Sequence, residues 1–182
     1  MEKTPSNPSG RFRMTTKMPY GWGKVPFDLE DRKKWMDLPL PIEEYAARIE
    51  RMRDKMRMHG FDALVVYGTR GDRGPIRYLT NFEDYYKGDN LCVIPLEGEP
   101  AFITNSVFHG EPMHSGVQHV WMRDVRCTAH PRTAPDAASV FDHLADVLRD
   151  RGLSGGKVAL SGDAAAALKE PISQVLPGAG LS

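Results

Sequence analysis

The most constraining feature of this sequence is an amphipathic segment over residues 41–59, followed after Gly60 by a continuous apolar run. Pro41 suits the first turn of a helix, and Gly60 is the expected left-handed stop. The run at 63–67, Ala-Leu-Val-Val-Tyr, predicts a strand that is covered on both faces. A helix, a tight turn and a buried strand together favour an α/β layered domain. The apolar side chains that recur at the helical spacing of three and four are Ile42, Tyr45, Ala46, Ile49, Met52 and Met56.

Further elements are expected downstream. Residues 91–96 and 101–104 flank a Glu-Gly-Glu-Pro turn and predict a hairpin, in which Pro95 places its strand near an edge or at a bulge. The other expected elements are a strand at 117–122, a helix at 137–148 with Gly152 as its stop, a strand at 157–160, and a helical segment at 164–175 that is interrupted near Pro171.

Residues 1–38 differ from the rest, because prolines and glycines interrupt both helix and strand hydrogen bonding there. We expect an irregular N-terminal arm over 1–38, with a short helix near 28–37, and an α/β domain over 39–182. The arm also carries aromatic side chains that are costly to leave in water, which predicts that it docks on the domain or on a second subunit. These side chains are Tyr20, Trp22, Phe27 and Trp35.

Composition excludes several classes of function. The 182 residues include 24 Lys plus Arg and 24 Asp plus Glu, so no net field draws the molecule to nucleic acid or an anionic membrane. The N-terminus has no apolar stretch suited to a signal peptide, and no run approaches the length of a membrane span. Cys92 and Cys127 fit structural thiols rather than a disulfide scaffold. We therefore expect a cytoplasmic protein that binds neither nucleic acid nor membrane.

From Pro41 to about Leu181, the order of motifs resembles the N-terminal domain of the creatinase, prolidase and Xaa-Pro aminopeptidase family. The resemblance rests on the helix-then-strand unit, in which Glu44-Tyr45-Ala46-Ala47-Arg48-Ile49 precedes His59-Gly60-Phe61-Asp62-Ala63-Leu64-Val65-Val66. It also rests on Tyr78-Leu79-Thr80-Asn81-Phe82, which is similar to the family's Tyr-Leu-Thr-Gly-Phe segment with Asn81 where glycine is common. The hairpin, the later helix and the last strand follow in the family's order.

The resemblance implies a mixed β-sheet with helices on both faces, similar in layout to ribonuclease H, and no catalytic centre within this domain. In the family a pita-bread catalytic domain follows, and in most branches two Asp, one His and two Glu there bind a pair of divalent metals. This chain ends at Ser182, where that domain would begin. We therefore expect no cofactor here, with a metal pair only if a catalytic domain follows. The expected partners are that domain or a second copy in a homodimer.

The loop Glu83-Asp84-Tyr85-Tyr86-Lys87-Gly88-Asp89 is the strongest candidate site. Two tyrosines beside a lysine could form an aromatic wall with one cation, suited to a small ligand that bears a carboxylate. In the family the corresponding loop can reach the active site of a neighbouring subunit. The resemblance thus makes Tyr85, Tyr86 and Lys87 candidate substrate-gating residues. The alternative is that the tyrosines pack at the sheet edge and Lys87 is solvated.

Catalytic alternatives are weaker. His109, Glu111 and His114 have side chains that can bind metal ions. They lack the spacing of a metal site on a helix, since a glycine and a proline between them disfavour a helix. Gly152-Leu153-Ser154-Gly155-Gly156 matches a nucleophile-elbow pattern, but it follows a helix and precedes a strand, which favours a turn. Two other hypotheses stay open: a hydrolase with an unrecognised site built from these ligands or Cys127, and a stand-alone module that binds a small molecule through the 83–89 loop.

Overall fold

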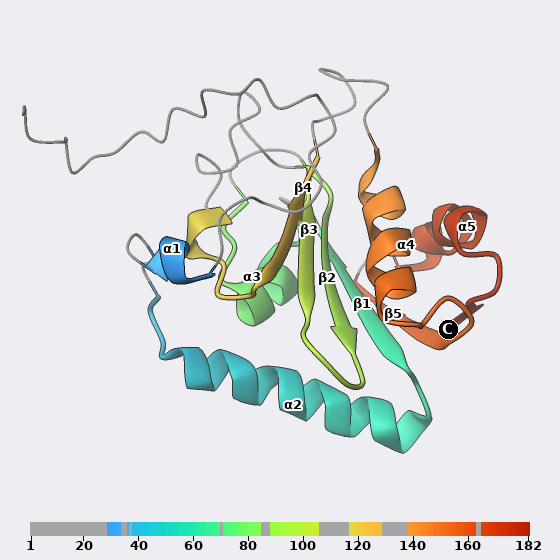
Figure 1. Ribbon diagram of the computed structural model, residues 1–182, viewed down its shortest axis with the longest axis horizontal. Helices are drawn as coiled ribbons and strands as arrows, with labels where there is room; N and C mark the ends of the chain where they lie inside the picture. The colour runs from blue at the N-terminus through green and yellow to red at the C-terminus, as the bar shows by residue number, and fades with distance from the viewer. Residues whose placement is uncertain are drawn as a thin grey trace, which may run out of the picture.

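A six-stranded mixed sheet forms the centre of the computed structural model (Figure 1). The structure describes residues 29–33, 36, 38–69, 71–84, 88–105, 117–128, 138–162 and 165–182. The strand order is β4-β3-β2-β1-β5-β6. The strands are β1 (Ala63–Gly68), β2 (Asn90–Pro95), β3 (Ala101–Thr104), β4 (Asp124–Cys127), β5 (Lys157–Ser161) and β6 (Gly180–Leu181).

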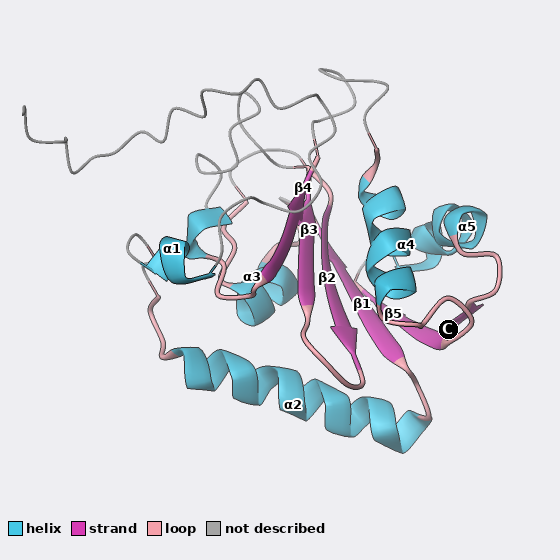
Figure 2. Cartoon of the chain, viewed as in Figure 1, coloured by secondary structure: helices cyan, strands magenta, loops and turns pink. Residues whose placement is uncertain are grey.

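Helices cover both faces of the sheet (Figure 2). The helices are α1 (Leu29–Lys33), α2 (Ile42–His59), α3 (Gly74–Thr80), α4 (Val140–Asp150) and α5 (Ala165–Val175), with a short 3-10 helix, η2, at Val117–His119. β1 pairs antiparallel with β2 and parallel with β5, while β2 pairs antiparallel with β3 and β3 parallel with β4. The expected mixed sheet between two helical layers is confirmed.

Alternation along the strands divides the core into two layers. In β2, Cys92 and Ile94 belong to the cluster beneath α2 and α3, whereas Leu91 and Val93 belong to the cluster beneath α4 and α5. All four side chains are fully buried. Successive side chains of a strand point to opposite faces, so an uninterrupted apolar run satisfies both layers at once. This is why the strands read as continuous apolar runs rather than as alternating ones.

The predicted helix at 41–59 is confirmed almost to the residue. Pro41 immediately precedes α2, and Gly60 ends it in the left-handed conformation, with φ of 68°. The Gly60 and Phe61 amides donate to carbonyls of the last turn, which satisfies groups that a helix end would otherwise leave unpaired. β1 then starts at Ala63, directly after this turn. The helix–turn–strand unit thus places α2 along the sheet.

Three sequence predictions are corrected by the structure. The expected strand at 117–122 is η2 followed by an extended link, because Val117 and Val120 are both buried at helical spacing; the strand begins at Asp124. Pro95 lies in the interior strand β2 and not at an edge, and it is tolerated because the ladder to β3 stops at Val93. α5 runs on through Pro171, since Leu168 and Ile172 hold both halves against the sheet.

Asn81 occupies the position where the family that this sequence resembles commonly has glycine. It ends α3 with φ of 63°, the left-handed region that asparagine tolerates better than most residues. Its side chain accepts a hydrogen bond from the Tyr45 hydroxyl at 3.1 Å and donates to the His119 carbonyl at 3.2 Å. The asparagine therefore joins α3 to α2 and to η2, which a glycine could not do.

We expect Asn81→Ala to lower the free energy of unfolding by about 2 kcal/mol, because it loses two hydrogen bonds and keeps a strained backbone. Asn81→Gly loses the same bonds but relieves the strain, so we expect a loss about 1 kcal/mol smaller. Urea denaturation of the two variants measures the difference. Equal stabilities of the two variants would contradict a contribution of the left-handed backbone at residue 81 to the loss of stability in Asn81→Ala.

Asp124 ties the edge strand β4 to the end of α4. Its carboxylate accepts hydrogen bonds from Arg126 Nε at 3.1 Å and from an Arg151 guanidinium nitrogen at 3.0 Å. Burial alone would raise the pKa of Asp124, but the two guanidinium groups outweigh it and hold the pKa below the ordinary value of 3.8. The ionised form is therefore favoured in the folded state.

This arrangement predicts an acid-dependent contribution to stability. Because folding depresses the pKa of Asp124, its contribution is present above the ordinary pKa and is lost as the pH falls below about 4. Asp124→Asn should lower the free energy of unfolding by about 1–3 kcal/mol at pH 7, with a smaller difference from the wild type near pH 2. Denaturation across pH tests this. Asp146→Asn, in an exposed pair with Arg149, is the control and should cost less than about 0.5 kcal/mol.

Candidate functional site at the polar end of the sheet

A row of buried polar side chains lies at the end of the sheet where β1 and β3 finish and β2 starts. Strand pairing places Gly68 opposite Asn90, and Asn90 opposite Thr104. The Asn90 amide donates to Asp84 Oδ2 at 2.8 Å and to the Gly68 carbonyl at 3.3 Å, while its oxygen accepts from the Thr104 hydroxyl at 2.6 Å. Asp84, Asn90 and Thr104 are each at most 1% exposed. Asn90 therefore joins two strands to the segment after α3.

A second set of hydrogen bonds lies beside the first. The Tyr67 hydroxyl donates to Asp89 Oδ1 at 2.6 Å, and the Asn105 amide donates to Asp89 Oδ2 at 3.1 Å. The Asp89 backbone N–H donates to Asn105 Oδ1 at 2.6 Å. Burial and the neighbouring carboxylate raise the pKa of Tyr67, so its phenol stays protonated and keeps donating. Asp89 is thus held from β1 and from the end of β3.

Glu83 anchors the other side of the same loop. One of its oxygens lies 2.6 Å from an Arg73 nitrogen and the other lies 2.8 Å from an Arg77 nitrogen, both arginines belonging to α3 or its start. Asp84 follows directly and receives the Asn90 amide. Residues on both sides of the segment 85–87 are therefore held by side-chain contacts to neighbouring elements. These contacts, to α3 on one side and to the sheet on the other, set the distance between the two ends of the loop.

The sequence-predicted site residues themselves lie outside the described residues. This applies to the proposed gating residues Tyr85, Tyr86 and Lys87, and to the metal candidates His109, Glu111 and His114. Their chain neighbours are described: Asp84 and Gly88 flank the first set, and Asn105 precedes the second at the end of β3. These described neighbours of the two segments lie close together at the same end of the sheet. The roles of the six residues stay predictions.

The described residues hold no assembled metal-binding group. No group of three or more His, Cys, Asp or Glu side chains among them is arranged to hold a metal ion. Cys92 and Cys127 are fully buried in the core, and burial raises the pKa of the Cys92 thiol, which disfavours the reactive thiolate. Gly152 has φ of 69° in the turn between α4 and β5, so the pattern around Ser154 is a turn, as expected.

The polar row is the part of the site that sequence reasoning missed. Asp84 and Asp89 lie within the predicted loop, but Thr104 enters the sequence prediction only as the end of an apolar run, and Asn90 and Asn105 do not enter it. A signal did exist, because asparagine and threonine at both ends of a hairpin interrupt an otherwise apolar pattern. The hairpin register decides which of these side chains form hydrogen bonds with one another.

The fold matches that of N-terminal domains in solved structures. One is the Xaa-Pro aminopeptidase from Streptococcus thermophilus, 20% identical with a TM-score of 0.53, covering 76% of this chain and 90% of that chain. Another is a prolidase from Thermococcus sibiricus, 14% identical with a TM-score of 0.55, covering 76% of this chain and 34% of that chain. The fold thus defines the class: an α/β domain with a mixed sheet, of a type that is also present in these two structures.

The chain belongs to the creatinase/prolidase N-terminal domain family, whose model matches residues 48–182. It is also 31% identical over 135 residues to the ectoine hydrolase of Halomonas elongata, an alignment that covers 70% of this chain. The chain spans about 31% of the length of that relative. The resemblance inferred from the motif order is therefore confirmed. In the described part of the chain, every helix is too short or too polar to cross a membrane.

Proposed function

We propose that this domain is a non-catalytic part of a hydrolase that contributes to oligomerisation and to shaping substrate access to a partner subunit's active site. The observation that carries the proposal is the anchoring of the 83–89 loop at both ends. Glu83 is paired with α3, Asp84 with Asn90, and Asp89 with Tyr67 and Asn105. A loop held in this way presents Tyr85, Tyr86 and Lys87 from a rigid base, which suits contact with a separate site.

The catalytic chemistry then belongs to another domain. Among the described residues, no group of three or more His, Cys, Asp or Glu side chains is arranged to hold a metal ion. We propose that the divalent metals implied by the family are held by a catalytic domain. The relative in Halomonas elongata is an ectoine hydrolase. We therefore propose a small substrate bearing a carboxylate, with ectoine as the first to test. Lys87 would supply a cation near that carboxylate, and the two tyrosines an apolar wall.

The non-catalytic part of the proposal is tested with the purified 182-residue chain. It is incubated with ectoine, creatine or an X-Pro dipeptide in the presence of Mn²⁺ or Co²⁺. We expect no turnover. Turnover that disappears in His109→Ala or His114→Ala would show a catalytic site within this chain and would contradict the proposal.

The association part is tested separately by light scattering over a range of protein concentrations. We expect a dimer to form as the concentration rises. A strict monomer at high concentration would contradict a role of this domain in oligomerisation.

The access role is tested in the protein that joins this domain to a catalytic domain. Tyr85→Ala with Tyr86→Ala should raise KM with little change in kcat, because a gating wall binds substrate without touching the reacting atoms. Met58→Ala, at a side chain of α2 that is 73% exposed, is the control. An unchanged KM in the double variant would argue against gating by this loop.

A further inference from the structure

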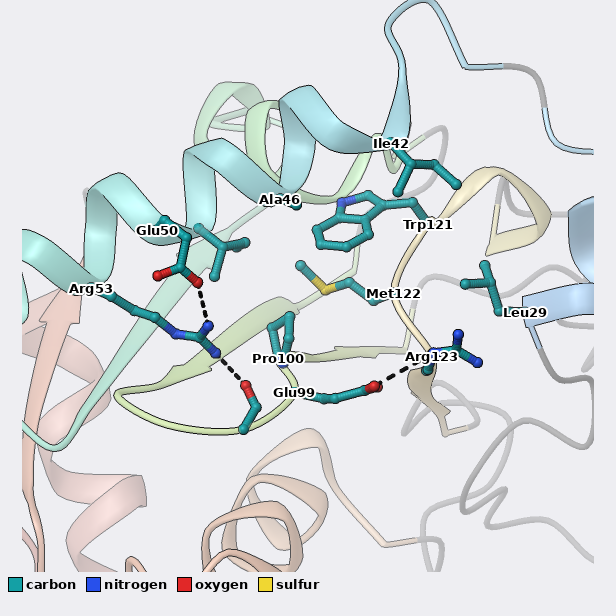
Figure 3. A pocket seen from close by; sticks show the side chains of 12 residues that line it. Leu29, Ile42, Ala46, Glu50, Arg53, Glu99, Pro100, Trp121, Met122 and Arg123 are labelled. Atoms are coloured by element: carbon teal, nitrogen blue, oxygen red, sulfur yellow. Dashed lines mark hydrogen bonds and ion pairs between the residues drawn. The ribbon is translucent and has the colours of Figure 1, made fainter.

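A groove of about 340 Å³ lies between α2 and the β2–β3 turn, away from the polar end of the sheet (Figure 3). One wall is α2 and the other is formed by the β2–β3 turn and residues 121–123. Leu29 of α1 lies at one end, and Arg53 lies at the other. The apolar side chains that line it are Leu29, Ile42, Ala46, Ile49, Pro100, Trp121 and Met122.

The charged side chains at the rim are already paired with one another. Arg53 pairs with Glu50 and also donates to the Pro95 and Gly98 carbonyls. Arg123 pairs with Glu99 at 3.4 Å. No net charge is left in the groove to select an ionic ligand. The groove still exposes apolar surface to solvent, and this surface favours an apolar occupant.

The chain itself already enters this groove. Leu29 is only 6% exposed, and α1, the helix that carries it, lies against η2. The residues before Leu29 belong to the N-terminal arm, and residues 1–28 lie outside the described residues. Leu29, at one end of the groove, is thus the first described residue of the N-terminal arm.

The sequence before Leu29 has the pattern of a strand-like segment with one apolar side. Residues 23–29 read Gly-Lys-Val-Pro-Phe-Asp-Leu, and Pro26 disfavours a helix at the residue before it. In an extended chain alternate residues share a side, so Val25 and Phe27 fall on one side and Lys24 and Asp28 on the other. Leu29, the first residue of α1, follows directly and is buried at one end of the groove.

We propose that residues 23–28 of the arm lie along this groove, with Val25 and Phe27 against the apolar wall of α2. The lengths agree. Six extended residues span about 20 Å, whereas the wall from Ile42 to Arg53 is about 16 Å long at 1.5 Å per helical residue. Covalent continuity with Leu29 also gives the segment a high effective concentration at the groove, which favours it over the arm of a second copy.

The test uses the full chain with Trp22→Phe and Trp35→Phe, so that Trp121 in the groove is the sole tryptophan. In this background Phe27→Ala should lower Tm by about 3–6 °C, because an aromatic side chain leaves an apolar contact. It should also increase acrylamide quenching of Trp121. Phe12→Ala, the same change elsewhere in the arm, is the matched control and should change neither quantity.

Two further measurements locate the occupant. Ala46→Glu places a charge on the exposed wall of α2, and in that background Phe27→Ala should have little additional effect on quenching. Quenching should be independent of protein concentration. An effect of Phe27→Ala no larger than that of Phe12→Ala, or a full effect in the Ala46→Glu background, would overturn the proposal. Quenching that rises on dilution would place the arm in the groove of a second copy and would overturn the intramolecular occupant.

Discussion

Replacing Phe102 with alanine is expected to lower the free energy of unfolding by about 3–5 kcal/mol, the largest effect of any single change considered for this domain. Phe102 is fully buried in β3, and its ring centroid lies 4.8 Å from that of Phe82. The substitution leaves a cavity between the sheet and the segment after α3, which two neighbouring strands prevent from collapsing. Chemical denaturation measures the loss.

The control for this prediction is Met58→Ala on α2. Met58 is 73% exposed, so its truncation removes a large apolar side chain without opening a cavity. We expect it to change the free energy of unfolding by less than about 0.5 kcal/mol. A loss of similar size in both variants would contradict the view that packing around Phe102 determines the stability of this layer.

The second large effect is expected for Asn90→Leu, which should lower the free energy of unfolding by about 3 kcal/mol. The change removes the amide that donates to the buried Asp84 carboxylate and the oxygen that accepts from Thr104. Hydrogen bonds to charged groups contribute more than neutral ones, and apolar atoms beside a buried carboxylate cannot replace them. Urea denaturation measures this loss as well.

A double-mutant cycle separates the network from simple packing. Thr104→Val removes the hydroxyl that donates to Asn90, so part of the same interaction is lost in each single variant. The double variant should therefore cost about 1 kcal/mol less than the sum of the two single variants. Thr104→Ser keeps the hydroxyl and should retain most of the stability. Strict additivity of Asn90→Leu and Thr104→Val would contradict a shared hydrogen-bond network.

Much of the fold could be predicted from periodicity alone. The helix over 41–59, its stop at Gly60 and the following buried strand depend on side chains near one another in sequence, and all three are confirmed. The errors arose where short segments depended on distant partners. Residues 117–122 contain apolar side chains that suit either a turn of helix or a strand, and only the pairing of β4 with β3 shows where the strand begins.

Less of the site could be predicted. Asp84 and Asp89 were within the candidate loop, but their partners come from β1, β2 and the end of β3. Tyr67 and Asp89 are 22 residues apart, and no local pattern indicates that they form a hydrogen bond. The gating roles of Tyr85, Tyr86 and Lys87 stay predictions.

The layered α/β class and the principal helix–strand unit follow from the sequence alone, because hydrophobic periodicity and turn chemistry are local properties. The order of the motifs along the chain indicated the family. The positions of Asn90 between Gly68 and Thr104, and of Leu29 at one end of the groove along α2, depend on the tertiary structure. The physical reason is register. A shift of one residue in the hairpin would send every side chain of β2 to the opposite face, and that choice is made by two packed layers acting together.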